Sequence, residues 1–286
     1  MKSKHYIMIS GIAAAIGLVI RATEYLLFID AGGYYKGSKP LAYVLYAVLF
    51  LVSAFAFIIM LSKTKDQADS AIAGGKAIGI LSILSAVITA TFSGWMAMSL
   101  SSAVPALLHR ALLVIGMLAA AALAVFGIGA FSGKTPAVLQ FIGFMPAVFV
   151  CLYGVCEFYQ SFDRAQQSGT SYLMLSLGAL ALYLTALIYS KVGAPVTLKR
   201  LTATAVLLPT FACVWGGGYI IGCITGGAVF NIGHVLFALL QFIFTACAFT
   251  TLFRLDKKDT VPNIESTLDD ELNTYFKEIS TENTDE

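Results

Sequence analysis

The chain has 286 residues, of which 58% are hydrophobic and only 12% are charged, and its mean hydropathy is +0.83. Soluble domains carry about 25% charged residues, so this composition excludes an ordinary soluble enzyme, a disordered chain and a nucleic-acid-binding protein. The net charge of +2 is the sum of two unlike parts. Residues 254–286 hold 10 acidic and 4 basic residues, a charge of −6, and residues 1–253 carry +8.

Apolar runs of the length that a membrane helix needs, about 20 residues, recur eight times. We therefore predict an all-α integral membrane protein. Short connections with glycine and proline separate the runs, as in Ser132–Pro136. The eight predicted spans are Tyr6–Phe28, Leu41–Leu61, Ala77–Leu100, Ala106–Phe131, Ala137–Tyr159, Tyr172–Tyr189, Leu201–Ile224 and Val229–Phe253.

Lysine and arginine predict the orientation, because cytoplasmic loops carry an excess of them. With eight spans both termini lie on one side. That side collects twelve of the basic residues, and the opposite loops hold only Lys36, Lys39, Arg110 and Arg164. We therefore expect a multi-pass protein of the cell membrane with both termini in the cytoplasm.

The first span contains Arg21 and Glu24, three positions apart and so on one helix face. Apolar residues follow them, which places the pair inside the span. An ion pair within the helix is one interpretation. A functional site is the other, because ionisable residues in a membrane are costly and often functional. The run is long and no small-residue cleavage site follows, so we expect a membrane helix and not a signal peptide.

The third and fourth spans contribute Trp95, near the outer end of one, and His109 and Arg110, at the outer start of the other. Tryptophan is typical of the membrane interface, although a place in a vestibule is an alternative. The histidine has three interpretations: a metal ligand, a proton-handling group or a residue at the interface.

The fifth span contains Pro146 near its middle, where a proline permits a kink, and Glu157 near its outer end. The position that corresponds to Arg21 is Gly154. Glu157 therefore needs another partner, and the candidates are Arg110, Arg164 and Arg21 itself.

The seventh span combines Pro209 with Trp215 and with Gly216, Gly217 and Gly218. Each glycine weakens a helix by about 1 kcal/mol relative to alanine. A hinge or break is one interpretation, and close helix packing through small residues is the other.

The eighth span begins with Asn231 and His234, which share a face, and contains Gln241 two turns further in. It is predicted to present a polar stripe. After it, the apolar residues from Ile264 to Ile279 follow helical spacing among acidic residues, which predicts an amphipathic cytoplasmic helix. This acidic tail, 256–286, is expected to dock on basic loops or on a cytoplasmic protein partner.

Pairs of rare residues suggest an internal repeat of four plus four helices. The two tryptophans, the two glutamates that precede the tail and two of the three histidines fall in corresponding spans, in the same order. Both halves would then insert in one direction, as in parallel repeats of some transporters. The predicted units are residues 1–131 and 132–253, followed by the tail at 254–286.

These positions place the glutamates, the two histidines and the tryptophans in one layer in the outer part of the membrane. We predict a transporter or permease for a small solute or ion, in which one repeat rocks against the other. The alternatives are a non-catalytic subunit, sensor or scaffold that recruits a partner through its tail, and a membrane-embedded metalloprotein or enzyme. No cofactor is predicted, and a divalent metal in the layer is the weaker option. The candidate residues for substrate binding or proton coupling are Glu24, Glu157, His109, His234, Arg21, Arg110, Asn231, Gln241, Trp95 and Trp215.

Overall fold

The computed structural model describes residues 3–30, 34–37, 39–62, 72–99, 104–134, 136–161, 169–192 and 198–260. Eight helical segments in this part of the chain are long and apolar enough to cross a membrane, which confirms the all-α membrane prediction. The first four are α1 (Ser3–Leu27), α2 (Pro40–Leu61), α3 (Lys76–Ser99) and α4 (Ala106–Ser132). The predicted tail helix, 264–279, lies outside the described residues.

The fifth span is built from two helices, α5 (Leu139–Ile142) and α6 (Met145–Ser161). Pro146 is the second residue of α6 and does not kink the middle of a longer helix. A proline is tolerated in the first turn, where its missing N–H has no helical partner, whereas in a continuous helix its ring would clash with the carbonyl group four residues earlier. The break at residues 143–144 lies within one turn before Pro146, and the hinge expected at Pro146 stays a prediction.

The sixth span is α7 (Thr170–Val192), and the eighth is α10 (Ile232–Thr260). The seventh consists of α8 (Leu198–Ala212), one π-helical turn η2 (Cys213–Gly217) and α9 (Gly218–Thr225). Pro209 lies inside α8, one turn before η2. The span is thus helical throughout, with a local π-turn where the sequence allowed for a break. It ends at Gly226, whose φ of +76° is the left-handed conformation that glycine adopts readily.

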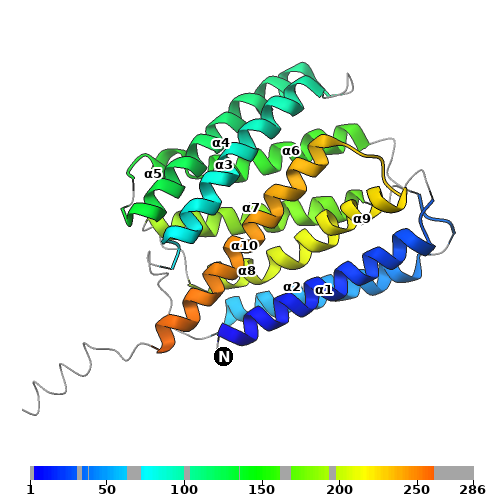
Figure 1. Cartoon of the computed structure of the whole chain (residues 1–286), viewed down its shortest axis with the longest axis horizontal. Coiled ribbons are helices and arrows are strands. Elements are labelled where there is room, and N and C mark those ends of the chain that lie inside the picture. Colours follow the sequence, from blue (N-terminus) through cyan, green and yellow to red (C-terminus); the bar gives the residue numbers. More distant parts are fainter. Residues whose placement is uncertain are drawn as a thin grey trace, which may run out of the picture.

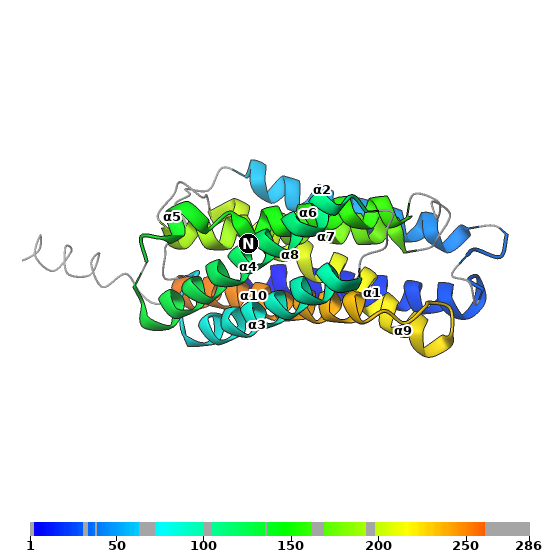
Figure 2. The same ribbon diagram turned by 90° about the horizontal axis from the view of Figure 1, so that it is seen from above.

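The helices run side by side along one direction, in the order shown in Figure 1. The α3–α4 pair lies on one side of the bundle and the α1–α2 pair on the other. Between them, α3 contacts α10 and α4 contacts α6, while α1 and α2 both contact α8. Seen from above (Figure 2), α2, α6 and α7 lie in one layer and α1, α3 and α10 in the other.

This arrangement divides the first predicted repeat unit into two pairs that flank the helices of the second unit. The four-plus-four repeat itself stays a prediction. Large apolar side chains such as Tyr43, Phe50 and Phe57 on α2 are mostly exposed, as expected for helices that meet lipid.

One end of the bundle carries the turn between α1 and α2, and we call it the hairpin end. Its hairpin comprises residues 28–36, of which 31–33 lie outside the described residues. Ile29 and Tyr35 form an antiparallel bridge, and the Lys36 N–H donates to the Phe28 carbonyl at 2.8 Å. The ends of α3, α6 and α9 and the starts of α4, α7 and α10 also lie at this end.

Candidate functional site: two ionisable pairs at the hairpin end

Arg21 and Glu24 form a completely buried ion pair on α1. The Arg21 Nη1 lies 2.6 Å from the Glu24 Oε2, and the exposed fractions of the two residues are 1% and 0%. The pair therefore satisfies the first interpretation, an ion pair within one helix. Such a pair carries no net charge, but each charge depends on the other because neither is in contact with water.

Tyrosines surround this pair. The Arg21 guanidinium carbon lies 4.6 Å from the ring centres of both Tyr25 and Tyr172, a distance at which a cation interacts favourably with an aromatic face. Arg21 also donates to the Tyr25 hydroxyl at 3.1 Å. The Tyr35 hydroxyl donates to the Glu24 Oε1 at 3.1 Å. The hairpin thus covers the pair from the hairpin end.

Tyr35 is the titratable member of this cluster that lies outside the membrane spans. Burial, together with the nearby Glu24 carboxylate, raises the pKa of Tyr35 from 10.0 to about 12, against an opposing effect of Arg21. A group whose pKa is raised on folding contributes stability that is fully present below its unfolded pKa. That contribution is lost as the pH rises from about 10 through about 12.

We therefore expect Tyr35 to ionise near pH 12, well after an exposed tyrosine. The tyrosinate absorbance of the folded protein, minus that of the Tyr35→Phe variant, isolates this group. The difference titration is expected to have its midpoint near 12. A midpoint near 10 would show that Tyr35 is not buried beside Glu24 in solution.

Glu157 and His234 form the second pair. The His234 Nε2 lies 3.3 Å from the Glu157 Oε1, and the side chains are 25% and 10% exposed. The partner of Glu157 in the described residues is thus a histidine of α10 and not Arg21 or Arg110. Arg164, the remaining candidate, lies outside the described residues. Unlike the Arg21–Glu24 pair, this one is partly accessible.

Aromatic rings hold His234 in place. Trp215 and Tyr219 contact its ring edge-on, with centres 5.9 and 5.2 Å away, and they stack on each other. Trp215 also packs against Phe237, one turn further along α10. Trp215 is only 4% exposed, so it belongs to the protein core and not to the interfacial belt.

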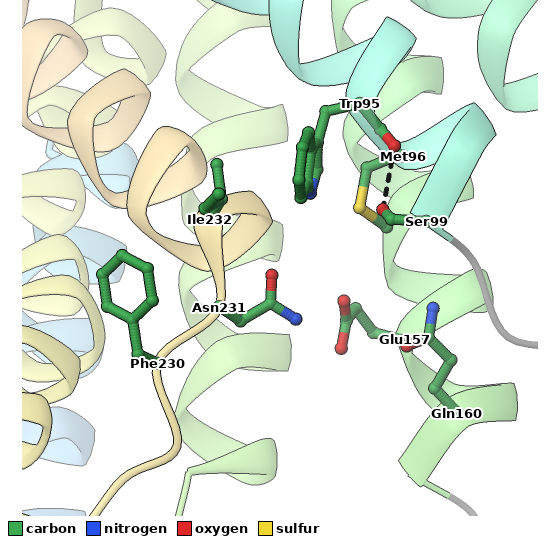
Figure 3. A pocket seen from close by; sticks show the side chains of 8 residues that line it. All are labelled: Trp95, Met96, Ser99, Glu157, Gln160, Phe230, Asn231 and Ile232. Atoms are coloured by element: carbon green, nitrogen blue, oxygen red, sulfur yellow. Dashed lines mark hydrogen bonds between the residues drawn. The ribbon is translucent and has the colours of Figure 1, made fainter.

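Glu157 lines a cavity of about 270 Å³ between α3, α6 and the start of α10. Figure 3 shows its carboxylate group directed toward the Asn231 side chain, with Gln160 beside it. The remaining residues are aromatic, apolar or hydroxyl-bearing. The full lining is Trp95, Met96, Ser99, Glu157, Gln160, Phe230, Asn231 and Ile232.

The other predicted site residues take different places. His109 contacts its own Pro105 carbonyl, with 3.2 Å between Nδ1 and the oxygen, and Arg110 is exposed. Gln241 is buried and donates to Ser176 at 2.9 Å. The described contacts thus place Glu24 and Glu157 in two separate sites, and His109 in neither.

The glycines of the seventh span lie where α9 meets α1. A Cβ atom at Gly217 would come within 2.5 Å of Leu18, and one at Gly218 within 2.7 Å of Arg21. A Cβ atom at Gly216 would point toward α10 and lie 3.4 Å from the Gln241 Oε1. These contacts favour close packing as the role of Gly217 and Gly218. Gly216 and Gly217 also belong to the π-turn, which is the irregular part of the backbone. Pi-turns of this kind are frequent at functional sites.

Metal binding receives little support from the donors that are present. In the described parts of the chain, no three His, Cys, Asp or Glu side chains come together as metal ligands. Glu157 and His234 supply two donors, whereas catalytic zinc sites use three protein ligands.

Several residues of both sites were not predicted from the sequence. Tyr25 follows Arg21 by four positions, the same spacing as Tyr219 from Trp215, so helical periodicity could have indicated both. Tyr35 and Tyr172 come from other elements, and no local pattern marks them. Ser99 and Gln160 lie at helix ends, where polar residues are common.

The eight long apolar helices define a polytopic α-helical membrane protein. Comparison of the chain with protein-family models, curated proteins and solved structures gave no significant match. A functional assignment therefore depends on the geometry of the two sites.

Proposed function

We propose that the protein transports a small solute or ion across the membrane, with Glu157 and His234 as the groups that bind it. The observation that carries this proposal is the cavity at the hairpin end, where a carboxylate group faces an open volume of about 270 Å³. An ionisable group at membrane depth is costly, and such groups usually mark functional sites. Glu24 is already neutralised by Arg21, so it is a structural residue in this proposal.

Buried polar groups on α10 and on two helices that contact it, α3 and α8, support a polar path in this proposal. Side-chain oxygens of five buried residues on α3, α8 and α10 make no hydrogen bond with the described residues. Buried hydroxyl and amide groups usually have partners, and a passing polar solute or water would supply them. The five are Ser82, Thr89, Thr210, Gln241 and Thr245.

The π-turn η2 is the part of the seventh span where we propose that a conformational change alters this path. Trp215 lies in η2 and contacts His234 directly. A shift of this turn toward regular α-helix would rotate α9 relative to α8 and change the surroundings of His234. In this proposal the seventh span moves, rather than one intact four-helix unit.

The orientation is part of the same proposal. Lysine and arginine are in excess at the end of the bundle opposite the hairpin end, which favours cytoplasmic termini. The cavity, at the hairpin end, would then open to the outside of the cell. Residues 261–286 of the acidic tail lie beyond the described residues. Its docking on a cytoplasmic partner stays a prediction.

Replacement of Glu157 by glutamine is expected to reduce transport at least about tenfold, because the amide keeps the shape of the side chain but not its charge. The measurement is uptake into proteoliposomes down a concentration gradient, carried out in turn for small cations, anions and neutral solutes. Tyr159→Phe is the matched control, since Tyr159 lies on the same helix with 46% of its surface exposed and does not line the cavity. Absence of flux for every solute, or equal flux in the Glu157→Gln protein, would contradict the proposal.

A further inference from the structure

We infer that the cavity at the hairpin end selects a small organic cation, namely a protonated or quaternary amine, with Glu157 as its counter-ion. This inference rests on the proposed function, because it names the substrate class of the same site. Three properties of the lining carry it: charge, aromatic character and size.

The charge of the cavity is negative or neutral. Among the described residues that line the cavity, Glu157 is the one ionisable side chain, and none is a lysine or an arginine. The other polar groups, on Ser99, Gln160 and Asn231, include oxygens that accept hydrogen bonds. An anionic solute would meet the Glu157 carboxylate, whose partner His234 carries a positive charge only when protonated and does not line the cavity, so the lining disfavours an anion.

The aromatic and sulfur-containing side chains separate an organic cation from a metal ion. Trp95, Phe230 and Met96 supply apolar and polarisable surface, and Trp95 lies on the same side of the cavity as Met96 (Figure 3). Indole rings bind ammonium groups through their faces, and quaternary ammonium ligands are recognised in this way. A hard metal cation would instead require six or more oxygen ligands. The described residues offer no cluster of three ligating side chains.

The size of the cavity restricts the solute to few atoms. Sites for drug-sized ligands have volumes of about 300–1,000 Å³, and this cavity, at about 270 Å³, lies just below that range. Tetramethylammonium is therefore a suitable probe, because it has a permanent charge and an apolar surface. Potassium has the same charge without that surface.

The two tryptophans of the chain allow binding to be observed directly. Because Trp95 lines the cavity and Trp215 contacts His234 instead, the Trp215→Phe protein reports on the cavity through Trp95 alone. We expect tetramethylammonium chloride to change its fluorescence saturably in full-length protein in lipid nanodiscs. Potassium chloride at equal ionic strength is expected to have no saturable effect.

Introduction of Glu157→Gln into this protein is expected to weaken tetramethylammonium binding at least about tenfold, since the charged partner is lost. Tyr159→Phe is expected to leave it unchanged. Calorimetry on the chain with both tryptophans intact checks that Trp215→Phe has not altered the site, and monodisperse elution checks that each variant folds. Equal binding by the Glu157→Gln protein, or an equal response to potassium, would overturn the inference.

The outcomes distinguish this inference from the proposed function. If flux of another solute depends on Glu157 while tetramethylammonium does not bind, the substrate class is wrong and transport stands. If tetramethylammonium binds through Glu157 but no solute moves across the membrane, the cation site stands and transport is wrong.

Discussion

Replacement of Arg21 by methionine is expected to destabilise the protein by about 3–5 kcal/mol, the usual cost of leaving one charge of a buried pair without its partner. Glu24 is 0% exposed, and its remaining hydrogen bond comes from the Tyr35 hydroxyl. That neutral donor cannot balance a buried carboxylate. The expected result is a large decrease in the temperature at which the purified protein loses monodisperse elution from a size-exclusion column.

The double variant Arg21→Met/Glu24→Gln tests whether the unpaired charge of Glu24 causes the loss of stability. Its glutamine still accepts a hydrogen bond from Tyr35 through the amide oxygen, and the site no longer contains a charge. We expect it to recover most of the stability, because replacing both partners of a buried pair is often close to neutral. If the double variant were as unstable as Arg21→Met, the loss would come from packing against Tyr25 and Tyr172 and not from charge.

Replacement of Gly222 by leucine is expected to have the second-largest effect, a loss of at least about 1–3 kcal/mol from overpacking. A Cβ atom at Gly222 would lie 2.6 Å from the Tyr25 ring and 2.9 Å from the Ala228 Cβ. Small residues at such contacts let two membrane helices approach closely. The larger side chain would push α9 away from α1 and disturb the Arg21 site.

Gly178→Leu is the matched control. Gly178 lies in α7, is exposed, and has no atom within 4 Å of the position that its Cβ would take. Because leucine favours helix more than glycine does, this variant is expected to be as stable as the wild type or more so. The same thermal assay compares the two. Equal stability of Gly222→Leu and Gly178→Leu would show that the α1–α9 contact is not tight in solution.

The eight spans were predictable because they depend on length and hydropathy alone, both of which are local properties. The Arg21–Glu24 pair was predictable for the same reason, since a spacing of three fixes it within one helix. Pro146 shows the limit of local patterns. A proline marks an irregular backbone but does not fix its exact place. Here the break falls at residues 143–144, just before the proline, because the new helix begins at Met145.

The Glu157–His234 pair could not be assigned in this way. Both residues were candidates, but their pairing requires α10 to lie beside α6 at one particular depth. From the sequence, Glu24, Glu157, His109 and His234 could be grouped only by their distance from the membrane surface, which is one coordinate of three. His109 shares that depth and still contacts only its own helix end in the described structure. Lateral position comes from side-chain packing between helices, which periodicity does not encode.

The spacing of Arg21 and Glu24 also has a consequence for biogenesis. Tyr172, which contacts Arg21 in the finished protein, is separated from it by four further spans and is synthesised much later. The first helix therefore enters the bilayer before this tyrosine exists. Because its positive and negative groups meet within a single turn, the nascent helix brings its own counter-charge and does not depend on a later segment for neutrality.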